Sequence, residues 1–392
     1  MKKEINSGDQ QKGVADFVNS ILEEAIVKRA SDIHLDLGPL DVSVRFRIDG
    51  VLYPSEDLPH IYQEEIISRI KVLAKMDIAE RRYPQDGNFG INYEQKNYNI
   101  RVSTIPSVYG EAVVMRVLNR DDSYAKLDKL GFDREQLRLV DRIIASPHSM
   151  VLISGPTGSG KTTLLYSILD TINEPSKNIV TVEDPVELEM PKIRQIQVND
   201  AIDLGFARIT RSILRQDPDV IMLGEIRDVD TAQNAFRAAL SGVLVFSTFH
   251  TFDIPGIVIR LVEMGVPRSV VAYGTSGVIT TRLIRKICLN CADQYVPNES
   301  ERVFLGNVQI ENMRSGKGCE MCHNSGYLGR TGIFEIVQFD DEIRSAVIEG
   351  ATTKDLQILF NKKIAKSLRE SALEKAVKGI TTPAEVIRII GL

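Results

Sequence analysis

The sequence predicts an α/β protein built from a small α+β unit followed by a larger domain with a parallel sheet. Three observations predict this fold class. Apolar and polar residues alternate in short strand-like segments before residue 120, and apolar runs separated by helical segments follow residue 127. A glycine-rich motif of the type that binds phosphate lies between the first of those apolar runs and a helix-like segment.

The composition of the 392 residues is that of a soluble globular protein and excludes several classes of function. Lys and Arg number 48 and Asp and Glu 53, so the net charge of −5 lacks the basic surplus of a protein that wraps nucleic acid. No apolar segment is long enough to span a bilayer, and no signal peptide is recognisable. We therefore expect a cytoplasmic protein, without a direct nucleic-acid partner, whose cysteines do not form disulfides.

Residues 1–120 are predicted to form the first unit. Apolar residues at helical spacing over 14–26 predict one amphipathic helix, and Asp49-Gly50 is typical of a tight turn. Alternation of apolar and polar residues predicts strands at 42–48, 98–102 and 111–118. The polar segment 119–126 offers no core face, so we interpret residues 121–127 as a linker.

Residues 128–392 are predicted to form the second domain. Short apolar runs are typical of parallel strands that are buried on both faces. Four such runs occur, at Met150–Ser154, Ile179–Glu183, Val220–Gly224 and Val243–Thr248. The part from 336 to 392 has a helical pattern, and Thr382, Pro383 and Glu385 have the spacing of a capping box that opens a last short helix.

A phosphate-binding loop is predicted between the first apolar run and the helix that follows it. The loop residues are Gly155, Pro156, Thr157, Gly158, Ser159, Gly160, Lys161, Thr162 and Thr163. The glycines allow successive backbone N–H groups to point at phosphate oxygens, at the start of a helix. Lys161 is expected to reach the β- and γ-phosphates, and the Thr162 hydroxyl to hold Mg²⁺.

Acidic residues and a histidine follow other predicted strands, at the edge where parallel sheets bind ligands. Glu225 ends one strand and is a candidate Mg²⁺ ligand, although Asp is more usual there. Glu183 ends another and is a candidate for polarising an attacking water. Each acid alone could equally be a helix cap or part of a solvated turn. A single histidine is more often structural, but the position of His250 at a strand end beside hydroxyl groups favours a role as sensor of the γ-phosphate.

The four cysteines of the chain form two CxxC pairs, Cys288 with Cys291 and Cys319 with Cys322. Two such turns present four thiolates, which predicts a structural zinc site with no open coordination position. The gap of 27 residues between the pairs exceeds the usual zinc-ribbon spacing. His323 could substitute as a ligand, and buried free thiols or a redox pair are the alternatives.

Taken together, the motifs resemble those of the assembly ATPases of bacterial type II secretion and type IV pilus systems. The resemblance covers about residues 15–392, and the motifs occur in order. They are RASDIHL (29–35), VRFRIDGVL (44–52), DIAERRYPQDGNFG (77–90), RVSTIPSVYGEAVVMRVL (101–118), GPTGSGKTT (155–163), TVEDPVE (181–187), LRQDPDVIMLGEIRD (214–228), STFHT (247–251), TRLIRKIC (281–288) and GYLGRTGIFE (326–335).

The resemblance implies a PAS-like N-terminal domain, a RecA-like ATPase domain with a zinc-binding module at about 284–335, and assembly as a homohexamer. It implies ATP, Mg²⁺ and Zn²⁺ as ligands, Glu183 as general base, Glu225 as the Walker B acid, and arginines that approach the nucleotide. The matching arginines are Arg45, Arg47, Arg101, Arg116, Arg194, Arg208 and Arg215, each of which could instead belong to a solvated surface. Arg208 and Arg215 are seven residues apart and would share one face of a helix.

Three features depart from the family pattern. The histidine box, usually close to TGHLVLSTLHTN, reads SGVLVFSTFHTF here, so Val243 replaces a histidine and Phe252 an asparagine. Thr281 stands where Gln is usual. The large N-terminal extension that docks many such ATPases to an inner-membrane partner is absent, so the chain is expected to be a short natural member or a shortened form.

The function implied is ATP hydrolysis that drives assembly of a pilus or pseudopilus. The expected partner is a platform protein of the inner membrane, with which a cytoplasmic motor would associate peripherally. Assembly is favoured over pilus retraction because retraction members lack the four-cysteine module. The alternatives are a DNA-uptake pseudopilus ATPase, a regulatory or scaffold protein that binds ATP with little turnover, and a thiol-redox protein.

Overall fold

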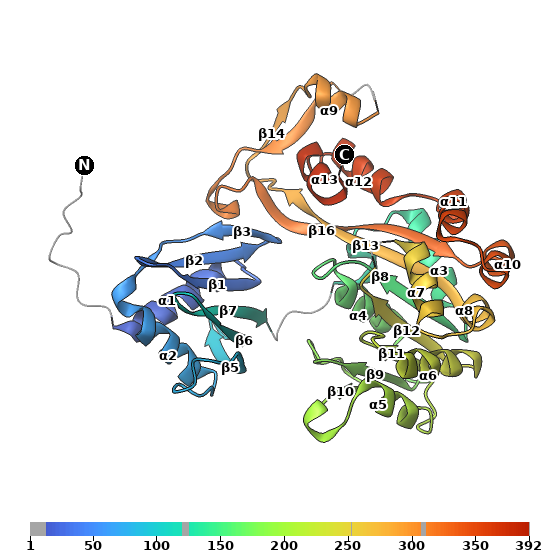
Figure 1. Ribbon diagram of the computed structural model, residues 1–392. Helices are drawn as coiled ribbons and strands as arrows, with labels where there is room; N and C mark the ends of the chain where they lie inside the picture. The colour runs from blue at the N-terminus through green and yellow to red at the C-terminus, as the bar shows by residue number, and fades with distance from the viewer. Residues whose placement is uncertain (1–12, 120–124, 252, 307–310, 392) are drawn as a thin grey trace. The chain divides into compact units, whose positions relative to one another are not determined.

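The computed structural model describes residues 13–119, 125–251, 253–306 and 311–391 (Figure 1). Its contacts divide the chain into two compact units, Met1–Ser123 and Tyr124–Leu392, which are described separately below. The division falls within the predicted linker, 121–127. Residues 121–124 of that linker lie outside the described residues, and Leu127 at its end is buried among apolar side chains of the second unit.

The first unit is an antiparallel sheet with two helices. Its strands lie in the order β3-β2-β1-β7-β6-β5, with β4 beside β2. The bounds are α1 (Val14–Val27), β1 (Asp32–Leu37), β2 (Asp41–Ile48), β3 (Val51–Pro54), β4 (Leu58–Pro59), η1 (His60–Tyr62), α2 (Gln63–Leu73), β5 (Gln85–Tyr93), β6 (Lys96–Ser107) and β7 (Gly110–Asn119). The predicted helix and the three predicted strands of this unit are therefore confirmed.

The first unit buries one face of its sheet against both helices. Alternation along β2 directs Val42, Val44 and Phe46 into the core, where they join the apolar stripe of α1. Arg45 and Arg47 occupy the intervening positions on the opposite face. The sequence pattern thus fixes which face of β2 carries the arginines, because a strand alternates strictly between its two faces.

The second unit is built on a mixed sheet of seven strands, in the order β10-β9-β11-β12-β8-β13-β16. The first six strands are parallel, and β16 pairs antiparallel with β13. The strands are β8 (Ser149–Ser154), β9 (Ile179–Glu183), β10 (Arg194–Gln197), β11 (Val220–Leu223), β12 (Leu244–Phe249), β13 (Thr275–Ile287) and β16 (Tyr327–Gln338). All four strands predicted for this domain are confirmed, and the sheet is mixed rather than wholly parallel.

Helices cover both faces of this sheet. Along β8, Met150 and Leu152 belong to one apolar core while Val151 and Ile153 belong to another, which explains why the strand is apolar at every position. The helices are η2 (Leu127–Lys129), α3 (Arg134–Ile144), α4 (Lys161–Ile172), η3 (Asp200–Ile202), α5 (Phe206–Ile213), α6 (Val229–Leu240), α7 (Ile254–Glu263) and α8 (Arg268–Gly274). Within the described residues, no helix has both the length and the apolar character that a membrane span requires.

A small insertion and four helices complete the second unit. The insertion lies between β13 and β16 and contains β14 (Ala292–Tyr295), α9 (Glu299–Phe304), β15 (Met313–Gly316) and η4 (Glu320–Cys322). Figure 1 shows β14 and α9 beyond the end of β16. The helices that follow are α10 (Asp341–Glu349), α11 (Thr353–Lys363), α12 (Leu368–Val377) and α13 (Pro383–Ile390). The predicted helical C-terminal part is confirmed.

The last helix begins as predicted, but one of its predicted capping contacts is replaced by another interaction. The Thr382 side chain accepts a hydrogen bond from the Glu385 backbone N–H, and Pro383 opens the helix. The Glu385 carboxylate, predicted to return to the cap, accepts hydrogen bonds from Arg285 and Arg388 and is completely buried. Two guanidinium groups are stronger donors for a buried carboxylate than one backbone N–H, because they carry opposite charge.

Candidate functional site

The predicted site residues of the second unit meet at the carboxyl edge of the parallel strands. Ser154 at the end of β8 is paired with Phe249 at the end of β12, and Leu223 at the end of β11 with Val182 in β9. The loop after β8, Glu225 after β11, His250 after β12 and Glu183 at the end of β9 therefore lie along one edge. Segments far apart in the sequence are brought together by strand register alone.

The glycine-rich loop adopts a conformation that its glycines make possible. Gly158 and Gly160 have φ of +75° and +92°, in the left-handed region that disfavours other residues. Gly160 caps α4, so the first backbone N–H groups of that helix have no acceptor within it. From β13, the Thr281 hydroxyl donates to the Ser159 carbonyl at 3.2 Å. The loop thus presents a helix N-terminus of the kind that binds phosphate groups.

Lys161 is folded back onto the loop that carries it. Its ammonium Nζ donates to the carbonyls of Gly155 at 2.7 Å and Pro156 at 3.0 Å, and lies 3.4 Å from His250 Nδ1. Burial lowers the pKa of Lys161 to about 8, although the negative charge of Glu225 raises it. The amine is therefore a cation at neutral pH that holds its proton less firmly than an exposed lysine.

A chain of polar contacts runs from Lys161 along the edge of the sheet. His250 Nε2 lies 3.4 Å from Glu225 Oε2, and Glu225 also contacts Arg227, which lies 3.5 Å from Asp184. If His250 is neutral, Nδ1 accepts from the lysine and Nε2 donates to the carboxylate. This assignment satisfies both neighbours, whereas a proton on Nδ1 would face the ammonium group.

Glu183 lies at the same edge but is enclosed. The residue is 4% exposed, and its carboxylate accepts hydrogen bonds from Thr181 Oγ1 at 2.5 Å, Gln195 Nε2 at 3.1 Å and the Tyr166 hydroxyl. Burial, followed by the charge of Glu183, raises the pKa of Tyr166, so the phenol keeps its proton and donates. Oε1 accepts two of these hydrogen bonds and Oε2 only one, so Oε2 keeps an acceptor position for a water molecule.

Sequence reasoning missed three residues that position these carboxylates, namely Tyr166, Gln195 and Arg227. Arg227 lies within the motif that contains Glu225 and was available as a signal. Gln195 comes from β10, an edge strand that was not predicted, and Tyr166 lies in α4 among apolar residues. Contacts between different elements have no periodicity in the sequence, so only the fold reveals them.

The predicted arginines are distributed over both units. In the first unit, Arg45 pairs with Asp36 at 2.5 Å, and Arg47 and Arg116 lie 3.8 and 3.0 Å from Asp32. Arg101 faces Arg116 across β6 and β7. These four arginines therefore share one sheet with acidic neighbours, as expected of a polar strand face.

In the second unit, Arg194, Arg208 and Arg215 are exposed. Arg208 pairs with Asp203 at 2.8 Å. The prediction that Arg208 and Arg215 share a helix face is wrong, because α5 ends at Ile213. After α5 the backbone N–H groups of Arg215 and Gln216 donate to the carbonyls of Ser212 and Ile213, so the chain continues in tighter turns than those of an α-helix.

The substituted histidine box affects this edge less than its sequence suggests. Val243 precedes the amino end of β12 and packs against the apolar core, whereas His250 follows the carboxyl end. The six residues of β12 separate the two positions by about 20 Å. Val243 is therefore distant from the glycine-rich loop that follows β8. Phe252, the other substitution, lies outside the described residues.

The four cysteines converge at the end of β13. Their sulfur atoms all lie within 4.8 Å of one another, and three of the separations are 3.7–3.8 Å. A tetrahedron with Zn–S distances of about 2.3 Å has edges of about 3.8 Å, so the four positions fit zinc. A disulfide requires about 2.05 Å between sulfurs, which these separations exceed. Within the described residues the cluster contains no histidine, so His323 is not one of its members.

Hydrogen bonding favours ionisation of one thiol of the cluster. The Asn290 amide donates to Cys319 Sγ at 3.2 Å and lowers the pKa of Cys319 to about 6. Burial instead raises the pKa of Cys291 to about 12. A bound divalent cation supplies the charge that would allow the remaining thiols to ionise as well.

Residues 7–388 match the family described as type II/IV secretion system protein. The chain belongs to this family. The prediction of a type II secretion or type IV pilus ATPase relationship is thereby confirmed. The match spans both units of the fold.

Named relatives come from both kinds of system. The chain is 43% identical to type II secretion system protein E of Pseudomonas aeruginosa, over 95% of this chain and 74% of that protein. It is 42% identical to the type IV pilus assembly ATPase PilB of Thermus thermophilus, over 95% of this chain and 42% of that protein. Sequence identity therefore does not separate secretion from pilus assembly.

Solved structures support the α/β fold with its mixed sheet. The pilus retraction motor PilT with bound ADP aligns with a TM-score of 0.60 and 25% identity, over 94% of this chain and 95% of that one. The ATPase DotB of Legionella pneumophila aligns with a TM-score of 0.70 and 22% identity, over 97% and 96% of the two chains. The family and its relatives are ATPases, in agreement with the prediction of an ATP hydrolase.

The lowered pKa of Lys161 predicts a pH dependence of nucleotide binding. The ammonium that attracts phosphate is lost as the pH rises through about 8, instead of near the ordinary lysine value of 10.5. We expect the affinity for a fluorescent ADP analogue to fall about 10-fold between pH 7.5 and 9.5. Lys161→Ala, which has no titrating amine, should bind more weakly and show no such fall. An unchanged affinity in the unmodified chain over this range would contradict the prediction.

Proposed function

We propose that the chain is an ATP-driven motor that assembles a pilus or pseudopilus in a secretion or pilus system. The observation that carries the proposal is the glycine-rich loop at the carboxyl edge, with Lys161, His250 and Glu225 in contact beside it. This edge combines a cation for phosphate with oxygen ligands for a metal. Membership of the ATPase family makes the same chemistry the expected one.

In this proposal ATP binds with its phosphates on the loop residues 155–163. The phosphates replace the carbonyls of Gly155 and Pro156 as partners of Lys161, which exchanges two neutral acceptors for charged ones. The Thr162 hydroxyl and the Glu225 carboxylate would hold Mg²⁺, a cation that prefers such oxygen ligands. Bound Mg²⁺ neutralises phosphate charge as it develops in the reaction.

We assign the general base to Glu183 and a phosphate-sensing role to His250. Attack by water on the γ-phosphate requires a carboxylate that orients the water, and Glu183 lies at the correct edge of the sheet. Its hydrogen bonds to Tyr166, Thr181 and Gln195 hold it in a resting position. His250 contacts both Lys161 and Glu225, so a phosphate that binds the lysine also perturbs the histidine.

The carboxylate roles predict different effects of two substitutions on ATP turnover. Glu183→Gln should lower kcat about 100-fold or more with little change in nucleotide affinity, because it removes only the base. Glu225→Gln should also raise the Mg²⁺ concentration needed for half-maximal turnover. Glu263→Gln, an exposed control on α7, should behave as the unmodified chain. Phosphate release at saturating ATP is the measurement.

The same experiment tests the alternative of a regulatory or scaffold protein. Tight ATP binding with equally slow hydrolysis by the unmodified chain and by Glu183→Gln would reject the motor and favour that alternative. Turnover that persists in Glu183→Gln but is lost in Glu225→Gln would reject only the assignment of the base.

We propose a homohexamer as the working form, with the arginines of the first unit completing the nucleotide site. Arg45, Arg47, Arg101 and Arg116 lie on one sheet and offer the positive charge that a γ-phosphate requires. The PAS-like identity of that unit and a platform partner at the inner membrane belong to the same proposal. Native mass spectrometry with ADP and Mg²⁺ should detect six chains, and a monomer at micromolar concentration would contradict it.

We propose that the cysteine cluster holds one structural zinc ion. The support is the set of sulfur separations of 3.7–3.8 Å, which suits a tetrahedral ion and leaves no ligand position for catalysis. In the bound state the four thiolates would join the two CxxC turns and fix the ends of the insertion.

The zinc site predicts a stoichiometric metal content. Elemental analysis of protein purified without added metal should give about one zinc per chain. Cys319→Ser and Cys291→Ser should each abolish this content, since a site with three thiolates binds zinc far more weakly. A chain that contains disulfides and no zinc would instead support the thiol-redox alternative.

A further inference from the structure

A cavity whose lining contains no residue of the glycine-rich loop lies where β16, α12 and the end of β13 meet. Its volume is about 770 Å³, within the range of ligand-binding pockets. Six basic side chains line it: Lys129, Lys286, Arg314, Arg330, Lys375 and Lys378. Its two acidic residues are Asp133 and Glu374. We refer to this cavity as the basic pocket.

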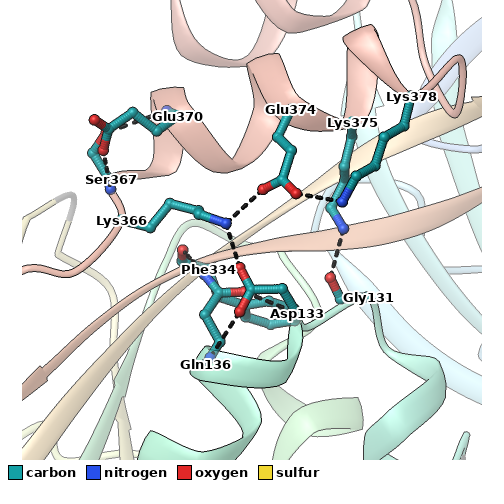
Figure 2. Close-up of polar contacts among 10 residues, drawn as sticks. All are labelled: Gly131, Asp133, Gln136, Phe334, Lys366, Ser367, Glu370, Glu374, Lys375 and Lys378. Carbon is teal, nitrogen blue, oxygen red and sulfur yellow. Dashed lines mark hydrogen bonds and ion pairs between the residues drawn. The ribbon is translucent and has the colours of Figure 1, made fainter.

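The two acidic residues of the basic pocket are already neutralised. Figure 2 shows the Lys366 ammonium, which lies outside the lining, between Asp133 and Glu374. Its distance to Glu374 Oε2 is 2.5 Å. Lys378 contacts the other carboxylate oxygen of Glu374. These four groups form a balanced set, so neither carboxylate is available to compensate the other cations.

The remaining cations leave the pocket with excess positive charge. Lys375 donates to the Gly131 carbonyl at 2.5 Å, a neutral acceptor, and burial lowers its pKa (Figure 2). The side chains of Lys286 and Arg314 have no hydrogen-bond or ion-pair partner within the described part of the chain. The side chains of Lys286 and Arg314, with no carboxylate to balance them, attract a negatively charged ligand to the cavity and repel metal ions.

Apolar side chains stand beside these cations. Leu289 is 79% exposed and Met321 58% exposed, although both are large hydrophobic residues. Each projects from one of the two CxxC turns, and both line the basic pocket. Phe132 and Ile287, which are buried, form part of the same lining. Exposed apolar residues next to a charged rim are typical of protein-binding surfaces, where Met and Arg are enriched.

We propose that the basic pocket binds an acidic protein segment with apolar side chains. The acidic groups would pair with Lys286, Arg314 and Lys375, and the apolar groups would cover Leu289 and Met321. A small phosphate compound would use the cations alone and leave both apolar side chains in water. The pocket is formed only by the second unit and requires no part of the nucleotide chemistry.

The experiment uses the full chain and a fluorescein-labelled peptide of aspartate and glutamate with leucine at every third position. Fluorescence anisotropy should detect binding that weakens as NaCl rises from 50 to 200 mM. Lys286→Glu combined with Arg314→Glu should weaken binding about 10-fold or more. Leu289→Ser combined with Met321→Ser should weaken it several-fold. Lys354→Glu, an exposed control on α11, should have little effect.

Two further controls distinguish an acidic protein segment from other ligands of the basic pocket. The same peptide with lysine in place of its acidic residues should not bind, and millimolar pyrophosphate should not displace the acidic peptide. Both double variants should have the ATP turnover and the circular dichroism of the unmodified chain, since the four substituted side chains are exposed. Absence of peptide binding, equal binding by all variants, or displacement by pyrophosphate would each overturn the proposal.

Discussion

The second unit depends on one strand, β13, which contacts the glycine-rich loop near its middle and leads into the cysteine cluster at its end. The strand pairs with β8 on one side and with β16 on the other, so its backbone is held by two ladders. Thr281 supports the loop through the Ser159 carbonyl. Four residues later, Arg285 holds the buried Glu385 carboxylate of α13 at 2.7 Å, and Cys288 follows the end of the strand. The loop, the last helix and the cluster therefore share one rigid support.

The Arg285–Glu385 pair shows why this support is sensitive to substitution. The Arg285 guanidinium also lies 4.0 Å from the centre of the Tyr327 ring, so it is fixed on two sides. Glu385 is completely buried and shared between Arg285 and Arg388. Loss of either member of a buried pair leaves an uncompensated charge, which typically costs about 3–5 kcal/mol. Truncation after α12 would therefore remove the partner of Arg285 as well as a helix.

The candidate site could be predicted from the sequence wherever a motif coincides with a strand end. Glu183, Glu225 and His250 each follow an apolar strand, and strand ends of one parallel sheet share an edge. The contacts within that edge could not be predicted, because Tyr166 and Gln195 reach Glu183 from elements that are distant in sequence. The enclosure of Glu183 is a property of packing, which leaves no periodic signal.

Failures of sequence reasoning occurred where two local rules competed. The spacing of Thr382 and Glu385 indicates a capping box, yet the carboxylate is used by two arginines that the spacing does not reveal. The prediction for Arg208 and Arg215 requires one helix through both residues, whereas α5 ends at Ile213. The spacing of residues along a segment does not show where its helix ends.

The convergence of the cysteines also explains the unusual interval between the two CxxC turns. Cys288 and Cys319 have sulfur atoms 3.8 Å apart, so the intervening segment begins and ends at the same place. The entropic cost of closing such a loop grows only with the logarithm of its length, by about 0.6 kcal/mol for each doubling. Loop closure therefore adds little to the cost of this long interval, and the segment also packs Phe304, Leu305 and Met313 into an apolar core with Ile284 and Ile333. The 27-residue interval is thus a small folded insertion whose two ends meet at the cysteine cluster.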